Sequence, residues 1–269
     1  MAALITGASS GLGAEFATQL AAAGHDVVLV ARSATKLELL ATKLERDYRI
    51  HPTVIVQDLG DPNAAERILA EIDHLDLTVT LLVNNAGFGT CGRFEEIPLM
   101  RDHQQLMVNV VALADLTHAL IPGMLKEGAG HIINVASTAA FQPSPYFAVY
   151  SAAKAFVLNF SLALREEYRD RGIAVLAVCP GPVETAFFDV IGTRKAAVTG
   201  KMSTPQSVVS ASLKALKNDR GYVVPSFSNF MAAHLIPRRP RTLVARLAGR
   251  ITRQVLDTEE LRPSTVTKP

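Results

Sequence analysis

The chain is poor in the residues that define several large classes of protein. Among its 269 residues it has no tryptophan and only two cysteines, Cys91 and Cys179. Two scattered cysteines outside any C-x-x-C motif exclude a disulfide framework and favour a reducing compartment. The seven histidines show no metal-ligand spacing, so we expect no bound metal.

Charge of one sign and long apolar runs are also scarce. The formal net charge of +2 is too small to indicate nucleic acid as a partner. No uninterrupted apolar stretch reaches the roughly 18 residues of a membrane-spanning helix. The first residues, MAALITGASSGLG, lack the basic region of a signal peptide. We therefore expect a cytoplasmic protein. A weak peripheral contact with an anionic membrane is possible only through a C-terminal segment.

The chain is rich in aliphatic residues in a regular order. Hydrophobic residues make up 49% of it. It contains seven β-rich runs, and a helical pattern separates each of the first five from the next run. Such nearly unbroken apolar strands are typical of a parallel sheet buried on both faces. We predict an α/β chain with a doubly wound Rossmann fold, a seven-stranded parallel sheet with helices on both faces. The predicted strands lie at 3–6, 26–31, 53–57, 79–84, 131–136, 173–179 and 221–224.

A glycine-rich segment, TGASSGLG, follows the first predicted strand. Gly7, Gly11 and Gly13 have the spacing G-x-x-x-G-x-G, which differs from the dinucleotide fingerprint G-x-G-x-x-G. Both patterns bring a tight backbone turn close to a pyrophosphate at a helix N-terminus. A plain strand-to-helix turn is the alternative, but the position directly after the first strand favours nucleotide binding.

The end of the second predicted strand indicates which nucleotide is bound. Ala31 stands where an acidic residue would accept hydrogen bonds from the ribose of NAD, and Arg32 follows it. An arginine can hold a 2′-phosphate through two charge-assisted hydrogen bonds, with Ser33 and Lys36 able to assist. We therefore predict NADP as cofactor, with NADPH preferred over NADH.

The stretch YSAAK places Tyr150 and Lys154 one helical turn apart on one face of an apolar helix. Taken alone, this pair is explained by long side chains that cover apolar surface and reach water at their tips. Together with the nucleotide motifs, it resembles the Tyr-x-x-x-Lys motif of the short-chain dehydrogenase/reductase family.

The resemblance to that family covers roughly residues 1–225. Its motifs here are TGASSGLG, QDL at 57–59, NNAG at 84–87 and PGPVET at 180–185. The resemblance implies a catalytic tetrad of Asn109, Ser137, Tyr150 and Lys154. The cofactor-binding residues that it implies, with Arg32 from the argument above, are Gly7, Ser9, Ser10, Gly11, Leu12, Gly13, Arg32, Asp58, Leu59, Asn85, Ala86, Gly87, Tyr150, Lys154, Pro180, Gly181, Val183 and Thr185.

The implied chemistry is an NADP-dependent exchange of hydride between a carbonyl compound and its alcohol. Tyr150 would exchange a proton with the substrate oxygen, Ser137 would hold that oxygen, and Asn109 would anchor a water chain. A free tyrosine has a pKa of about 10, so activity at neutral pH requires a drop of about 3 units. We expect the positive charge of Lys154, at about 4 Å, to supply it.

Some residues keep two interpretations at this point. Thr185 contacts the cofactor or caps a helix, and Cys91 lies near substrate or fills a small buried space. Apolar residues after Thr185 (Phe187, Phe188, Val190 and Ile191) and the stretch 227–237 suggest a hydrophobic ketone or aldehyde as substrate, steroid-like, acyl or another lipid carbonyl. The alternatives are an inactive NADP-sensing protein and a peripheral membrane or scaffold protein.

Two further predictions concern partners. The helix over 152–164 is apolar around most of its circumference, so we expect a homodimer or homotetramer, joined by the helix near 103–127. Residues 226–256 form a basic extension, followed by a flexible tail at 257–269. Within it, Leu243, Val244, Leu247, Ile251 and Val255 share one predicted helix face, with Arg246, Arg250 and Arg253 roughly opposite.

The basic helix of the extension allows three roles. It can cover the substrate pocket, lie on an anionic membrane, or steer phosphate-bearing acyl carriers. Covering the pocket is favoured among them, because most amphipathic helices bury their apolar face within their own protein.

Overall fold

The computed structural model describes residues 2–187, 191 and 202–256. Its seven strands form one fully parallel sheet in the order β3-β2-β1-β4-β5-β6-β7. The order reverses beside β1, where a doubly wound sheet places its ligand. The strands are β1 (Ala2–Thr6), β2 (Asp26–Ala31), β3 (Thr53–Val56), β4 (Val79–Asn84), β5 (Gly130–Val135), β6 (Ile173–Val178) and β7 (Tyr222–Val223).

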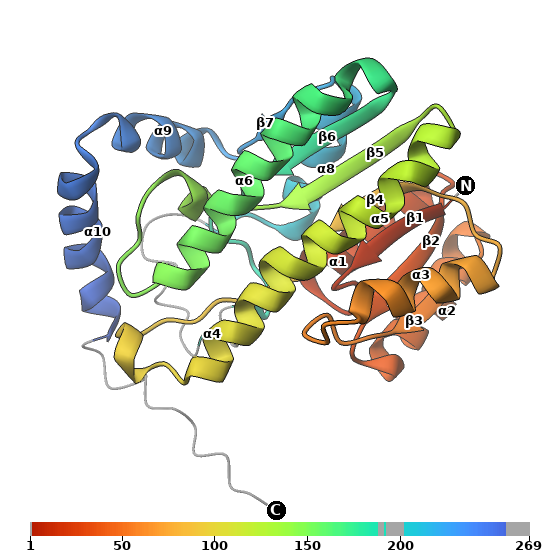
Figure 1. The fold of residues 1–269 in the computed structure, drawn as a ribbon, viewed down its shortest axis with the longest axis horizontal. Coiled ribbons are helices and arrows are strands. Elements are labelled where there is room, and N and C mark those ends of the chain that lie inside the picture. The colour runs from red at the N-terminus through yellow and green to blue at the C-terminus, as the bar shows by residue number, and fades with distance from the viewer. Residues whose placement is uncertain (1, 188–190, 192–201, 257–269) are drawn as a thin grey trace, which may run out of the picture.

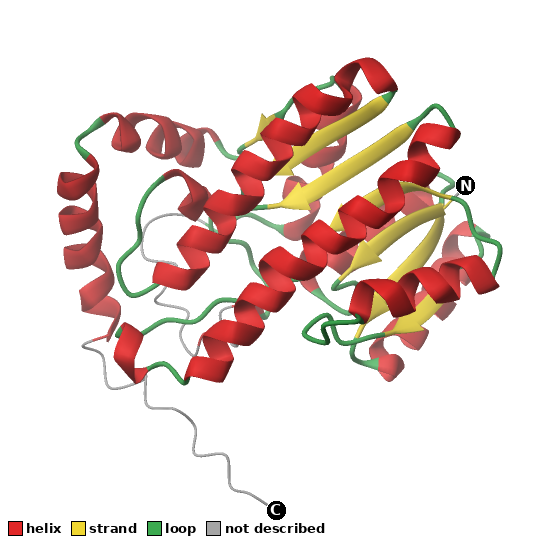
Figure 2. Cartoon of the chain, viewed as in Figure 1, coloured by secondary structure: helices red, strands yellow, loops and turns green. Residues whose placement is uncertain are grey.

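Helices cover both faces of the sheet, which confirms the predicted fold class (Figures 1 and 2). One face is packed by α1 (Gly11–Ala22), α2 (Ala34–Tyr48) and α8 (Pro205–Lys217). The opposite face is packed by α3 (Ala64–His74), α5 (Ala112–Lys126) and α6 (Ala148–Tyr168). The helix α8 was not predicted, although Thr204 caps it through a bond from the Ser207 N–H, and Pro205 begins it.

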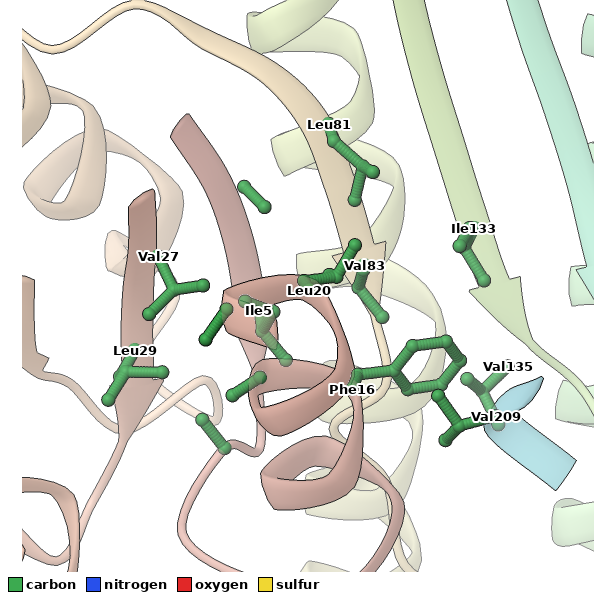
Figure 3. Close-up of a cluster of buried hydrophobic side chains, with 14 of the residues drawn as sticks. Ile5, Phe16, Leu20, Val27, Leu29, Leu81, Val83, Ile133, Val135 and Val209 are labelled. Carbon is green, nitrogen blue, oxygen red and sulfur yellow. The ribbon is translucent and has the colours of Figure 1, made fainter. Parts of the chain in front are cut away.

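Alternation along the strands divides the core into two layers. Ile5 and Leu29 are paired in register on neighbouring strands, and both point to the α1 side of the sheet. Phe16 of α1 extends over the sheet toward Val135 and Val209, as Figure 3 shows. The strand boundaries agree with the predicted runs to within one residue, because buried aliphatic runs are the strongest signal in the sequence.

A long helical segment runs beside the carboxyl end of β4. It consists of α4 (Leu99–Leu106), a π-helical turn η2 (Met107–Val111) and α5. By length and composition alone it is apolar enough to cross a membrane, although it contains no uninterrupted apolar run of 18 residues. Its apolar residues Leu116, Leu120 and Met124 are buried against the sheet, and 39% of its most apolar stretch is buried inside the protein.

The C-terminal extension lies beyond the carboxyl ends of the strands (Figure 1). It consists of α9 (Phe227–Leu235), a 3-10 turn η6 (Ile236–Arg238) and α10 (Arg241–Leu256). His234 fixes α9 to the sheet, because its ring lies 2.7 Å from the Tyr222 hydroxyl and stacks beside it. Of the apolar face predicted for α10, Val244 is buried, whereas Leu243, Leu247 and Ile251 are exposed.

Candidate active site

The glycine-rich loop between β1 and α1 has the backbone that a phosphate-binding turn requires. Gly7 and Gly11 adopt φ values of 67° and 57°, in the left-handed region that favours glycine. Gly13 has another role, because a Cβ there would collide with the Gly7 carbonyl oxygen and the Asn85 amide. The loop is therefore packed tightly against the end of β4, with the N-terminus of α1 open to the cleft.

Thr6 joins this loop to the NNAG segment, a contact that the sequence analysis missed. Its hydroxyl accepts hydrogen bonds of 3.0 Å from the backbone N–H groups of Asn85 and Ala86. The Asn85 side chain donates in return to the Thr6 carbonyl oxygen, at 2.9 Å. The threonine that begins the TGASSGLG motif was the signal in the sequence that could have indicated this contact.

Arg32 follows buried Ala31 at the end of β2, the strand next to β1. Its guanidinium is exposed and lies 4.0 Å from a carboxylate oxygen of Asp58, which follows β3. The other Asp58 oxygen accepts a hydrogen bond from the Gly60 N–H, at 2.9 Å. The structure therefore brings the Arg32 cation close to Asp58, another of the predicted cofactor-binding residues.

Asn109 is buried within the π-helical turn η2 and acts on the backbone beside the site. Its side-chain oxygen accepts a hydrogen bond from the Phe88 N–H, and its amide donates to the Phe88 carbonyl oxygen, at 2.9 Å. Its oxygen also lies where a Cβ of Gly87 would sit. The segment after NNAG is thus clamped to the helix, and Asn109 itself does not line the cleft.

Tyr150 and Lys154 project from the first two turns of α6 toward the carboxyl end of β5. The Lys154 ammonium donates a hydrogen bond of 2.8 Å to the Val135 carbonyl oxygen and lies 5.9 Å from the centre of the Tyr150 ring. Ser137 follows β5 and hydrogen-bonds to Tyr150, a contact that lowers the tyrosine pKa. The three side chains therefore meet at the floor of one cleft.

The pKa of Tyr150 in the folded protein differs from the lowered value that we expected from the sequence. Burial raises the pKa of Tyr150 to about 12, and the hydrogen bond from Ser137 only partly offsets it. Burial lowers the pKa of Lys154 to about 8. The lysine does not bring the tyrosine pKa down in the protein alone, because its ammonium is held by Val135 and is itself poorly solvated.

These elements surround a cleft of about 1260 Å³. Small-molecule pockets are typically about 300–1,000 Å³, so this cleft has room for a dinucleotide and a second molecule. Of the predicted site residues, Gly13 and Asn109 lie behind its wall. The others line it: Gly7, Ser9, Ser10, Gly11, Leu12, Arg32, Asp58, Leu59, Asn85, Ala86, Gly87, Ser137, Tyr150, Lys154, Pro180, Gly181, Val183 and Thr185.

The cleft beside Tyr150 is lined by apolar residues that the sequence indicated and by others that it did not. Phe187 lies 5.6 Å from the Tyr150 ring, and Ile191 approaches Gly89 beside it. The predicted lining residues Phe188 and Val190 lie outside the described residues. Four lining residues belong to the predicted stretch 227–237: Asn229, Ala232, Ala233 and Ile236. The lining residues that were not predicted include Phe88, Arg101, Gln104, Gln142, Ser144, Phe147 and Thr252.

The extension therefore closes part of the cleft, as the favoured interpretation of its helix expected. Asn229 of α9 packs against Gly181 so closely that a Cβ at the glycine would collide with its amide. Thr252 brings α10 to the same cleft. These contacts were invisible in the sequence, since they join the PGPVET segment to residues about 50 positions away.

The structure shows the surroundings of Thr185 and Cys91, for which the sequence left two interpretations each. The Thr185 hydroxyl accepts a hydrogen bond of 3.3 Å from the Phe187 N–H, as at a helix N-terminus, and also faces the cleft. Cys91 is half-buried and does not line the cleft, and burial raises its pKa to about 11. It has the properties of a small filler and not of a reactive thiolate.

The donors in the cleft fit a nicotinamide dinucleotide. Left-handed glycines leave the loop without side chains where a pyrophosphate approaches, and Arg32 supplies a cation at the ribose end. Fold and site thus define a dinucleotide-binding protein with an acid–base group beside its cofactor cleft.

Comparison with known proteins identifies the family. Residues 1–196 match the model of the short chain dehydrogenase family, so the chain belongs to this family, whose members are nicotinamide-dependent oxidoreductases. A very-long-chain 3-oxoacyl-CoA reductase of Anas platyrhynchos is 36% identical over 188 residues. That match spans 68% of this chain and 60% of the relative's own length.

Solved structures resemble the whole chain. A short-chain dehydrogenase from Sphingobium yanoikuyae in complex with NADPH has a TM-score of 0.80 and 29% identity, covering 100% of this chain and 99% of the other. A 7beta-hydroxysteroid dehydrogenase has a TM-score of 0.83 and 26% identity, covering 92% and 96%. The first of these alignments includes the C-terminal extension.

Proposed function

We propose that the protein is an NADPH-dependent reductase of a hydrophobic ketone or aldehyde, which also oxidises the corresponding alcohol. One observation carries this proposal. Ser137, Tyr150 and Lys154 meet at the floor of a single cleft that has a glycine-rich loop at one end and apolar walls at the other. An inactive NADP-sensing protein would have no need of this acid–base group.

Each end of the cleft has its own set of binding residues. The backbone of the loop from Gly7 to Leu12 and the N-terminus of α1 would hold the pyrophosphate. Lys154 would contact the nicotinamide ribose, and Thr185 with the PGP segment would face the nicotinamide. When bound, the cofactor supplies the hydride that is transferred to the carbonyl carbon of the substrate.

Tyr150 would supply the proton that completes the reduction. Its hydroxyl proton passes to the substrate oxygen as the carbon receives hydride, so a ketone becomes an alcohol and a tyrosinate remains. Ser137 would donate a hydrogen bond to the same oxygen. The ammonium of Lys154 would stabilise the tyrosinate, because a buried anion near a cation costs less than an isolated one.

NADPH is the cofactor that the adenosine end favours. No carboxylate follows β2 directly, where one would repel a 2′-phosphate, and the exposed guanidinium of Arg32 is free to approach it. The distance of 4.0 Å to Asp58 marks a weak ion pair at the surface, so the arginine can reorient at little cost.

The substrate that we propose is bulky and apolar. Phe147 and Phe187 flank the Tyr150 ring, and Ala232, Ala233 and Ile236 of the extension form part of the wall. Relatives named for 3-oxoacyl-CoA and hydroxysteroid substrates support a lipid-like carbonyl compound. Three polar residues that also line the cleft, Gln142, Ser144 and Asn229, would orient the substrate.

NADPH oxidation in the presence of a panel of carbonyl compounds tests the proposal. The panel contains steroid ketones, a 3-oxoacyl thioester, aryl ketones and a short aldehyde, each measured with the wild type and with Tyr150→Phe. We expect turnover of at least one bulky ketone that is lost in the variant. If the wild type binds NADPH but oxidises it with none of these compounds, or if the variant is equally active, the proposal is wrong.

A further inference from the structure

The helix α10 presents three different stripes to its surroundings. Its docked stripe contains Val244, which is 3% exposed, Gly249, which lies against Pro145, and Thr252, which lines the cleft. A helix rotates by about 100° per residue, so a second stripe lies beside the docked one. This second stripe contains Leu243, Leu247 and Ile251 at intervals of four residues.

The second stripe is apolar and faces solvent. Leu243, Leu247 and Ile251 are 39%, 47% and 46% exposed. The preceding helix adds more exposed apolar surface, including Phe227 at 80%. We call the exposed apolar residues of α9, η6 and α10 the α9–α10 surface: Phe227, Phe230, Met231, Leu235, Ile236, Leu243, Leu247 and Ile251. Large apolar side chains that gather exposed on neighbouring helices indicate an interaction site.

Arginines border this surface, and among the residues that the structure describes none of them forms an ion pair with a carboxylate. Residues 221–256 contain no aspartate or glutamate. Six exposed arginines lie in the same segment: Arg238, Arg239, Arg241, Arg246, Arg250 and Arg253. On the helical wheel of α10, Arg250 lies about 20° from Leu243, so the charged stripe adjoins the apolar one. The partner must therefore be apolar and anionic.

We propose that the α9–α10 surface binds the surface of an anionic lipid bilayer. The leucines and Ile251 would enter the boundary between headgroups and acyl chains, and the arginines would remain among the anionic headgroups. A second copy of the chain is a poor partner here. A two-fold contact would bring the same arginines face to face, with no carboxylate from this segment between them.

The position of the α9–α10 surface would let membrane binding assist the entry of substrate. Ala232, Ala233 and Ile236 of the extension line the cleft, and so does Thr252 of α10. The bilayer would thus meet the part of the protein that closes the substrate end of the cleft. An apolar carbonyl compound could pass from lipid to the site with a short path through water. Membrane binding itself does not depend on the proposed reductase activity.

Vesicle flotation of the full chain tests the proposal. We expect binding to phosphatidylcholine vesicles that contain phosphatidylglycerol, little binding to pure phosphatidylcholine, and release at high salt. Reversal of Arg246, Arg250 and Arg253 to Glu should weaken binding by about 100-fold or more, since each surface arginine contributes about 1 kcal/mol. Replacement of Leu243, Leu247 and Ile251 by Ser should remove binding.

Two controls make the result specific. Reversal of Lys43, Arg46 and Lys126 to Glu changes the net charge equally, but leaves the α9–α10 surface intact, so binding should persist. Turnover of a water-soluble ketone should stay within about two-fold in all variants, because none of the substituted residues lines the cleft. Absence of binding to anionic vesicles at low salt, or equal loss in both charge-reversal variants, would overturn the proposal whatever the turnover.

Discussion

The Lys154 ammonium lies 5.9 Å from the centre of the Tyr150 ring, one turn along the same helix. Its hydrogen bond to the Val135 carbonyl oxygen fixes it at the end of β5. Both groups are perturbed by the same cause: poor solvation raises the tyrosine pKa to about 12 and lowers the lysine pKa to about 8. In the protein alone, therefore, each group favours its neutral form more than it would in water.

Tyr150→Phe should reduce turnover by about 100-fold or more and leave NADPH affinity within a few-fold. The substitution removes the transferable proton but keeps the ring that packs between Phe147 and Phe187. Steady-state kinetics and NADPH titration measure the two effects separately. Tyr146→Phe, four residues earlier, is the control and should retain activity. Near-normal turnover of Tyr150→Phe would exclude Tyr150 as the acid.

Stability should depend on pH through Lys154. With a folded pKa of about 8 and an ordinary value of about 10.4, the unfolded chain holds more protons than the folded chain between these values. Stability is thus reduced by the buried charge below about pH 8 and recovers as pH rises toward about 10. Relative to Lys154→Met, the wild type should gain about 1–2 kcal/mol between about pH 7.5 and about pH 9.5.

Urea unfolding of both proteins at the two pH values measures this gain. Lys126→Met, at an exposed position, is the control and should show no such change relative to the wild type. A constant difference between the wild type and Lys154→Met would mean that Lys154 keeps its ordinary pKa in the fold.

Arg32→Ala should weaken NADPH binding by about 10- to 100-fold and leave NADH binding nearly unchanged. The loss corresponds to about 1.5–3 kcal/mol, the contribution of hydrogen bonds to a charged group. Fluorescence titration with each cofactor measures it, with Arg46→Ala as a surface control. Equal affinity of the wild type for NADPH and NADH would contradict the proposed cofactor preference.

Two glycine-to-alanine substitutions should have opposite effects on stability. At Gly13 the added Cβ would collide with the backbone of Gly7, so we expect a loss of about 1–3 kcal/mol or failure to fold. At Gly123, inside α5, no atom lies within 4 Å of the added Cβ. Alanine is the better helix former there and should stabilise by up to about 1 kcal/mol. Thermal and urea unfolding compare the pair, and equal effects would show that Gly13 is not tightly packed.

The predicted oligomer can be tested through α6. Phe156 is 41% exposed on the outer side of this helix and stacks on Phe160. If this side meets a partner subunit, Phe156→Glu should convert a dimer or tetramer into smaller species, because it buries a charge. Light scattering at micromolar concentration measures the mass. Leu39→Glu, on exposed α2, should have no effect, and a monomeric wild type would disprove the oligomer.

Local chemistry was sufficient to predict most of the fold and the floor of the site. Buried parallel strands need continuous aliphatic runs, a phosphate turn needs glycines at fixed positions, and a helix brings residues four apart together. All three are properties of neighbouring residues in the sequence. For this reason the strands, the loop from Gly7 to Gly13, and the Tyr150–Lys154 pair could be located without a structure.

Only the tertiary structure decided which distant groups meet and how solvent reaches them. The hydrogen bonds of Asn109 to Phe88 and the contact of Asn229 with Gly181 join segments that are separated in the chain. The exposure of Leu243, Leu247 and Ile251 depends on how α10 docks. The pKa values of Tyr150 and Lys154 likewise follow from burial, which depends on all the elements packed around them. Residue types and spacing identify the reacting groups, whereas desolvation and long-range contacts are properties of the folded chain alone.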